Sequence, residues 1–212
     1  IEGSHHKIIN KKFNDLATGK IKRLIINMPP RHTKSEFASY LLPAWMIGKN
    51  PKLKIIQATH TADLAIDFGR KTKNLVDQDN YKELFPTRLQ EDSQAAGKWK
   101  TDKGGEYFAA GVGGAITGRG ADLLIIDEVS MLSLKLFIIL DLIAKRVKKK
   151  RETVFGGMQI IFAGDFYQLP PIGDENDVDS LKFCFESELW NEVFPKKNQI
   201  ILETIFRQTD DY

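Results

Sequence analysis

The stretch LLIIDE, residues 123–128, decides the fold. Four aliphatic residues in a row, without polar alternation, are typical of a strand that helices cover on both faces, as in a parallel sheet. The run ends in Asp127 and Glu128, and a carboxylate at the C-terminal end of such a strand lies where open α/β sheets bind their ligands. A buried strand that ends in an ordinary solvated turn has the same local pattern, so the neighbouring segments have to decide between the two interpretations.

Strands and helices alternate on both sides of this stretch. Apolar runs predict strands at residues 23–27, 54–59, 158–163 and 199–203, and apolar residues at helical spacing predict helices at residues 7–16, 35–48, 61–76, 134–147 and near 187–194. Trp99 and residues 106–110 suggest a small hairpin, and a glycine-rich segment, residues 111–120, leads into LLIIDE. The alternation predicts one α/β domain with a doubly wound, mostly parallel sheet and helices on both faces.

The composition is that of an ordinary globular domain. The chain has 212 residues, of which 42% are hydrophobic, and a net charge of +3, so the overall charge gives little reason to expect nucleic acid. Cys184 is the one cysteine, which excludes an internal disulfide or a cysteine-based zinc site and fits a reducing compartment. The opening IEGSHH lacks a signal-peptide pattern, and we assign no ligand role to His5 or His6. The most apolar segment, near residues 134–144, is too short to span a bilayer.

The segment MPPRHTKSE, residues 28–36, joins a predicted strand to a predicted helix. At such a junction the free backbone N–H groups and the helix dipole favour a phosphate. Lys34 can reach the terminal phosphates and the Ser35 hydroxyl can ligate magnesium, which is the division of labour in P-loop enzymes. Met28 and Thr33 stand where that pattern has glycines, and a left-handed backbone there would cost about 1–2 kcal/mol. Taken alone, the segment is better explained as an ordinary capped helix start, and only its pairing with the acids after residue 126 favours a phosphate site.

Three further elements complete the predicted phosphate site. Asp127 would hold magnesium through water, and Glu128 would orient and activate the attacking water. Gln168, in GDFYQLPP (residues 164–171), can contact the γ-phosphate or that water. Arg207, after the last predicted strand, can neutralise charge on the transferred phosphoryl group, an effect typically worth about 10³–10⁵ in rate. A solvent-facing glutamine and a surface arginine are the respective alternatives.

The segments NMPPRHTKSEFAS, IIQATHTADLA and GGEYFAAGVGGAITGRGADLLIID, within residues 2–127, resemble the ATPase domain of tailed-phage terminase large subunits, the motors that package DNA. The resemblance implies that Lys34 is the Walker A lysine, Ser35 the magnesium-side hydroxyl, and Asp127 and Glu128 the Walker B pair. It also implies a catalytic Arg31 inside a nucleotide-binding loop made of Pro30, Arg31, His32, Thr33, Lys34 and Ser35. Terminase loops deviate from the P-loop pattern, which accounts for the missing glycines.

From residue 124 to 212 the sequence resembles the PIF family of DNA helicases, a superfamily-one group. The segments that carry this resemblance are IIDEVSML, AKRVKKKRE, FGGMQIIFAGDFYQLPPI, FCFESELWNE and LETIFRQ. It implies that the Asp-Glu pair is motif II, that Gln168 lies in motif III, which links nucleotide to DNA, and that Arg207 is the motif IV arginine that reaches the γ-phosphate. The glycine-rich motif I and second motor domain of that family do not appear here, nor do the terminase coupling motif and nuclease domain. The chain therefore looks like a junction of two related motors.

Both families have the RecA-like fold of P-loop NTPases, in which a strand with an acidic tip lies beside the P-loop strand. We therefore expect residues 1–212 to form one P-loop ATPase domain that uses ATP and Mg²⁺ and acts on DNA without sequence preference. The terminase resemblance adds a homo-oligomer or a portal protein as partner and the host cytoplasm as location, while the helicase resemblance adds the nucleus or mitochondrion. The alternative is a folded but inactive nucleotide- or DNA-binding module, in which the missing second motor or nuclease domain and the mixed parentage leave Gln168 and Arg207 out of reach. Mismatched side-chain volumes at the junction would typically cost about 1–3 kcal/mol per site.

One dense basic cluster, residues 145–151, closes the helix after LLIIDE. It either makes salt-dependent contacts to DNA phosphates or is a solvated helix end that its dipole stabilises. Arg119 either faces DNA or a neighbouring subunit's nucleotide, or is an ordinary surface residue. We expect weak hydrolysis at best and no strand separation by this chain alone, since superfamily-one helicases need two motor domains and terminases act as rings.

Overall fold

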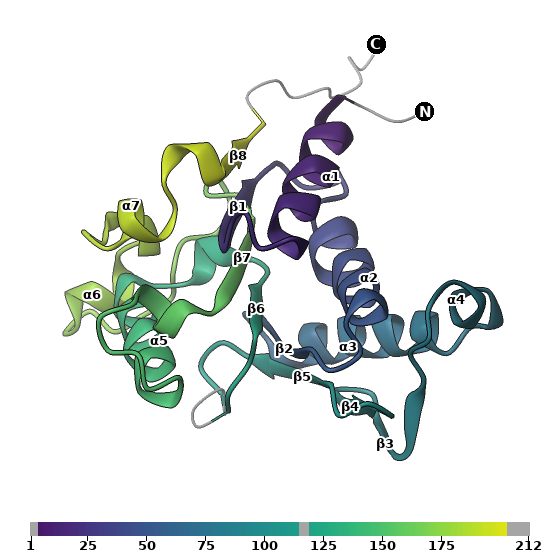
Figure 1. The fold of residues 1–212 in the computed structure, drawn as a ribbon. Helices are drawn as coiled ribbons and strands as arrows, with labels where there is room; N and C mark the ends of the chain where they lie inside the picture. Colours follow the sequence, from purple (N-terminus) through teal and green to yellow (C-terminus); the bar gives the residue numbers. More distant parts are fainter. Residues whose placement is uncertain (1–3, 115–118, 203–212) are drawn as a thin grey trace.

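The computed structural model describes residues 4–114 and 119–202, and its centre is an eight-stranded sheet with the order β3-β4-β5-β2-β6-β7-β1-β8 (Figure 1). Strands β5, β2, β6, β7, β1 and β8 run parallel, while β4 is antiparallel to β5 and β3 to β4. The strand bounds are β1 Arg23–Asn27, β2 Lys54–Thr59, β3 Leu89–Ala95, β4 Lys98–Thr101, β5 Glu106–Gly111, β6 Leu123–Ile126, β7 Gln159–Gly164 and β8 Gln199–Ile201. Among the described strands this gives the predicted α/β sheet, with an antiparallel ribbon at one edge.

Helices cover both faces of this sheet (Figure 1). One face carries α1 (Ser4–Ala17), the π-helix η1 (Glu36–Leu41) with its continuation α2 (Leu42–Lys49), and α3 (Ala62–Val76), followed by α4 (Asp79–Leu84). The other carries α5 (Leu134–Val147) and α7 (Trp190–Val193). The remaining short elements are η2 Val129–Met131, η3 Val154–Gly157, α6 Val178–Leu181, η4 Cys184–Glu186 and η5 Lys196–Asn198. None of the helices in the described ranges is long and apolar enough to cross a membrane.

The strand β6 lies between two hydrophobic cores, as its unbroken apolar sequence predicts. Leu123 and Ile125 belong to the core under α1, α2 and α3, whereas Leu124 and Ile126 belong to the core under α5. All four side chains are at most 3% exposed. Burial of the whole strand fixes its C-terminal end, and with it the position of the two carboxylates that follow.

Both cores combine residues from the two sides of the junction. In the first, Leu24 packs with Ile161, its register partner on β7. In the second, Ile56 packs in the cluster that contains Phe162 and Trp190. In the described structure, strands from both sides of the junction at residues 124–127 therefore belong to one continuous sheet.

The predicted element bounds agree closely with the structure, but one predicted neighbour relation is wrong. The bounds of β1, β2 and α5 are those expected from sequence. The acidic-tipped strand β6 does not lie beside the P-loop strand β1, because β7 pairs with both and separates them. β7 is apolar on both faces and buried from Ile160 onward, so it suits a central position. The helix expected near residues 187–194 shrinks to the four residues of α7.

Candidate nucleotide site

The loop after β1 has the left-handed turns that a phosphate loop needs, although glycine is missing from it. Arg31 has a φ of 64° and Thr33 a φ of 65°. The expectation of a left-handed Thr33 is confirmed, but the second such residue is Arg31, not Met28. Met28 is 1% exposed, and its N–H donates to the carbonyl oxygen of Gly164 at 2.9 Å. The loop thus begins as an extension of the β1–β7 pairing.

Local hydrogen bonds hold the strained turn in place. The Thr33 hydroxyl donates to the His32 carbonyl oxygen at 2.6 Å, and the Phe37 N–H donates to the Thr33 carbonyl oxygen at 3.0 Å. His6, from α1, hydrogen-bonds the Thr33 hydroxyl through Nε2 at 3.0 Å and stacks on Phe37 with ring centroids 5.0 Å apart. Sequence reasoning did not place His6 here, because a contact between α1 and the loop depends on tertiary packing.

The helix after the loop begins at Lys34 and takes the π form from Glu36 to Leu41. Single π-turns are often found at functional sites. Lys34 is 5% exposed, and Ser35 is half-buried. The first-turn N–H groups of any helix lack intrahelical partners, so this end is suited to an anion.

The Asp127 carboxylate is buried and held through both oxygens. Its Oδ2 accepts a hydrogen bond from the Ser39 hydroxyl at 2.8 Å, and its Oδ1 accepts one from the Glu128 N–H at 3.0 Å. Asp127 is 1% exposed and Ser39 is 0% exposed. Ser39 lies one helical turn beyond Ser35, and sequence reasoning missed it because a serine inside a helix carries no signal until its neighbours are known.

Glu128 stands beside Asp127 in a left-handed conformation, with a φ of 57°. Burial raises the pKa of its carboxyl group, while the ammonium group of Lys34 lowers it and the carboxylates of Asp127 and Asp165 raise it. The structure therefore brings Lys34, Asp127 and Glu128 together around one site. It adds Asp165, which sequence reasoning did not single out.

Asp165 follows the end of β7 and shapes the loop that carries Gln168. Its Oδ1 accepts the Tyr167 N–H at 3.0 Å, and its Oδ2 accepts the Gln168 side-chain amide at 3.4 Å. Asp165 is 7% exposed, whereas Gln168 is exposed. Gln168 thus lies next to Asp165, the acid after β7, with its amide directed partly at that carboxylate.

Two contacts fix this loop against the rest of the site. The Asn27 side-chain oxygen, at the end of β1, accepts the Phe166 N–H at 3.1 Å. A Cβ atom at Gly164 would lie 2.8 Å from the Val129 backbone nitrogen, so only glycine allows the end of β7 to approach the residue after Glu128. The ends of β1, β6 and β7 are therefore mutually positioned.

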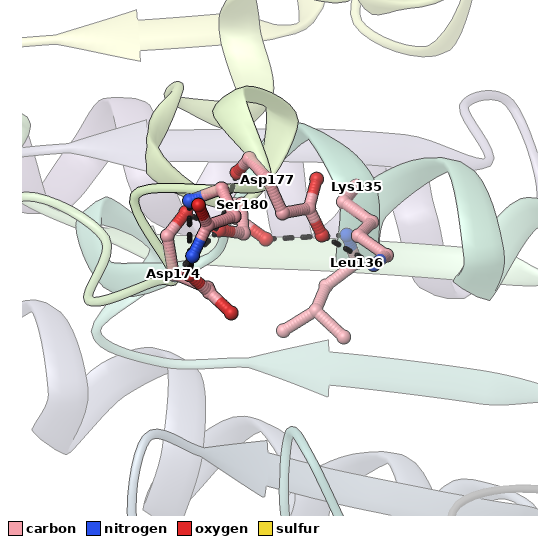
Figure 2. Close-up of polar contacts among 7 residues, drawn as sticks. Lys135, Leu136, Asp174, Asp177 and Ser180 are labelled. Atoms are coloured by element: carbon pink, nitrogen blue, oxygen red, sulfur yellow. Dashed lines mark hydrogen bonds and ion pairs between the residues drawn. The ribbon is translucent and has the colours of Figure 1, made fainter.

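The chain that leaves this loop is tied back to α5 (Figure 2). The Asp177 carboxylate pairs with Lys135, and the Ser180 hydroxyl donates to the Asp177 carbonyl oxygen at 2.6 Å. The Asp174 N–H donates to the Ser180 hydroxyl at 2.8 Å. These bonds close residues 174–180 into a compact turn, so the loop with Gln168 is anchored at both ends.

The oxygen atoms at this site suit a magnesium ion bound together with a nucleotide. Asp127 and Ser35 offer hard oxygen ligands, and Mg²⁺ is usually held by one or two protein ligands plus substrate phosphates and water. Within the described ranges no group of three or more His, Cys, Asp or Glu side chains is arranged to hold a metal by itself.

Arg119, which the sequence also singled out, is not part of this cluster. Arg207 lies outside the described residues. Arg119 is ion-paired with Glu106 at 2.9 Å, and its guanidinium lies 4.1 Å from the ring centroid of Phe108, far along the chain from the P-loop. The pairing favours a fixed position for Arg119 over an ordinary mobile surface side chain.

The basic cluster at the end of α5 also has partly structural partners. Lys145 is ion-paired with Asp141 at 2.7 Å, and Lys148 donates to the Ala121 carbonyl oxygen at 3.0 Å and pairs with Asp122 at 3.4 Å. Ala121 and Asp122 precede β6, so the cluster lies at the opposite end of the sheet from Asp127.

Comparison with known proteins bears directly on the second half of the chain. Residues 116–212 match the family model of PIF1-like helicases. The chain is 43% identical over 93 residues to the ATP-dependent DNA helicase RRM3 of Saccharomyces cerevisiae, and 38% identical over 87 residues to the human ATP-dependent DNA helicase PIF1. These matches cover 44% and 41% of this chain, but only 12% and 13% of the relatives, so the chain spans a small part of their length.

Solved structures extend the likeness in fold to the whole chain. The Pif1 helicase of Candida albicans superimposes with a TM-score of 0.58 at 22% identity, covering 100% of this chain and 42% of that one. A Bacteroides Pif1 in complex with ADP-AlF4 gives 0.57 at 18% identity, covering 99% and 43%. The fold is therefore the RecA-like α/β fold of these helicases, including residues before the junction. These comparisons concern the helicase resemblance, and the terminase resemblance stays a prediction.

Proposed function

We propose that this chain is an ATP-hydrolysing motor domain that acts on DNA. The single observation that carries the proposal is the convergence of Lys34, Asp127 and Glu128 at the ends of β1 and β6. There burial raises the pKa of Glu128, the Lys34 ammonium group lowers it and the Asp127 carboxylate raises it further. The match of residues 116–212 to PIF1-like helicases supports DNA as the partner. A terminase-type origin of residues 2–127, with an oligomer or a portal as partner, belongs to the proposal on its sequence motifs alone.

Each residue has a role that its position suits. The N–H groups at the start of the helix, together with Lys34, would bind and orient the phosphates. Ser35 and Asp127 would hold the magnesium ion, which supplies charge neutralisation when bound. Glu128 would accept the proton of the attacking water, a task that its raised pKa favours near neutral pH. Gln168 and Arg31 would contact the reacting phosphate. Arg207, which lies outside the described residues, would do the same.

Replacing Lys34 with alanine should abolish magnesium-dependent ATP hydrolysis, because it removes the cation beside the acid pair. Phosphate release by the purified protein measures this. The matched control is Lys71→Ala, an exposed lysine on α3. The enzyme proposal fails if the unaltered protein turns over ATP no faster than Lys34→Ala.

The second candidate function is a nucleotide- or DNA-binding module that does not hydrolyse ATP. The exposure of Gln168, and the bond of its amide to Asp165 at 3.4 Å, favour this candidate, since the amide is not held at the phosphate position. Titration with a non-hydrolysable ATP analogue separates the two: tight binding without turnover indicates the module.

A further inference from the structure

Part of one sheet face is left open by the helices. On the face that α5 covers, β4 presents Lys98 and Lys100, and their register partners on β5 are Phe108 and Glu106. Phe108 is half-buried, whereas Tyr107, on the opposite face under α3, is 0% exposed. Phe108 packs at the border of the second core, so part of its ring stays accessible on this open face, beside the two lysines.

A small cavity lies beside this ring. Its volume is about 210 Å³, and its lining includes Lys54, Phe108, Arg119 and Ala121. The guanidinium of Arg119 is held over Phe108 at 4.1 Å by its ion pair with Glu106. Pockets for whole ligands usually measure about 300–1,000 Å³, so this cavity suits a flat group about the size of one nucleobase.

Cations continue from the cavity to the end of α5. Lys148 reaches the Ala121 carbonyl oxygen, which joins the lining of the cavity to the basic cluster. We call the following set the basic band: Lys54, Lys98, Lys100, Arg119, Lys148, Lys149, Lys150 and Arg151. Of the acids next to the band, Glu106 and Asp122 are ion-paired to Arg119 and Lys148, and Glu152 is exposed at its end beside Arg151.

The band carries a surplus of exposed positive charge. Within the described ranges, Lys54, Lys98 and Lys150 are exposed and make no ion pair. The exposed acids Glu91 and Asp92 lie on β3, beyond β4, and limit the band on that side. A surplus of this kind attracts a polyanion even though the whole chain is only weakly basic.

The band lies apart from the nucleotide site. Lys54 and Glu106 are the first residues of β2 and β5, and Ala121 precedes β6. The nucleotide site is built at the other ends of the parallel strands, after Asn27 and Ile126. The two surfaces can therefore be tested separately.

We propose that the basic band binds single-stranded nucleic acid, with the phosphates along the lysines and one base seated in the cavity against Phe108 and Arg119. Bases stack on aromatic rings and on guanidinium groups, while phosphate contacts release counterions. The inference rests on the proposed function only in taking nucleic acid as the partner. Binding at the basic band requires neither ATP nor its hydrolysis.

The first test measures how binding to a fluorescent oligothymidylate of about 16 nucleotides depends on salt, in the absence of ATP. Each phosphate contact adds about 0.7 to the slope of log K against log salt for a single strand. Lys98→Ala with Lys150→Ala should therefore lower the slope by about 1.4. Lys71→Ala, on the opposite face, should leave it unchanged. An unchanged slope in the double variant overturns the proposal.

The second test addresses the seated base. Phe108→Leu should weaken binding of the oligothymidylate about tenfold, since base stacking on an aromatic ring is lost, but should leave the salt slope unchanged. An abasic strand of the same length should bind Phe108→Leu and the parent equally. Equal loss with both strands overturns the stacking contact. If Phe108→Leu melts at a lower temperature than the parent, the variants at the exposed residues Lys98 and Lys150 still decide whether the basic band binds the strand.

Two controls separate this inference from other outcomes. Lys34→Ala should bind the strand as tightly as the parent, so a failure of hydrolysis leaves the test intact. Polyglutamate at equal charge should compete less well than the strand with bases. If it competes equally, the band is a general polyanion surface and the proposed nucleic-acid site is wrong.

Discussion

At the residue scale, the bond between Ser39 and Asp127 is the feature with the clearest consequence. Ser39→Ala removes the hydroxyl that orients a buried carboxylate, and loss of a hydrogen bond to a charged group typically costs about 1.5–3 kcal/mol. We expect the variant to bind a magnesium–nucleotide complex more weakly. In calorimetric titrations it should need a higher Mg²⁺ concentration than the parent to bind the nucleotide. Ser130→Ala is the matched control, because its buried hydroxyl has no hydrogen-bond partner in the described structure. Equal behaviour of the two variants would show that Ser39 does not position Asp127.

Glu128→Gln should abolish hydrolysis, keep nucleotide binding and raise thermal stability at neutral pH. The folded-state pKa of Glu128 is raised, chiefly by burial, so its ionised form is less stable in the folded protein than in the unfolded one. This penalty is absent below the ordinary glutamate pKa of about 4.3 and grows as the pH rises through the raised value. The melting temperatures of variant and parent should therefore differ at pH 7 and converge at low pH. A constant difference at all pH values would contradict a raised pKa.

At the element scale, the packing of α5 against the sheet fixes the strand that carries the acids. Phe137 is 0% exposed and lies within 6.0 Å, between ring centroids, of Phe155, Phe162 and Trp190. Phe137→Ala should lower the free energy of unfolding by about 3–5 kcal/mol, measured by urea denaturation. Ile138→Ala, its neighbour at 38% exposure, should change it by no more than about 0.5 kcal/mol. Similar losses in both variants would indicate that α5 is not packed as described.

At the scale of the whole molecule, the nucleotide site joins strands from both sides of the junction. The P-loop follows β1, whereas Asp165 follows β7, and β7 pairs with β1 along its whole length. A ligand that binds only the folded state at one hundred times its dissociation constant stabilises that state by about 2.7 kcal/mol. The protein should therefore melt in a single cooperative transition, and magnesium–ADP should raise its melting temperature. The Lys34→Ala variant should not show this increase. Two separate transitions, of which only one responds, would show that the two halves fold independently.

The sequence by itself determined most of the strands and the long helices, and it singled out most residues of the proposed site. Runs such as RLIIN and KIIQAT are strands because their aliphatic centres, residues 24–26 and 55–56, are buried. Asp127 and Glu128 could be singled out because they follow such a run directly, and Lys34 because it lies between such a run and a helix. Hydrogen-bonded neighbours far apart in the chain could not be predicted this way. Only the tertiary structure placed β7 between β6 and β1, Ser39 against Asp127, and Asp165 beside Glu128, because strand order and side-chain partners depend on how whole faces pack. The roles of all the proposed site residues, Lys34, Asp127 and Glu128 as much as Gln168, Arg31 and Arg207, stay predictions. LLIIDE thus specified a buried strand with an acidic end, and the surrounding fold decided which groups those acids meet.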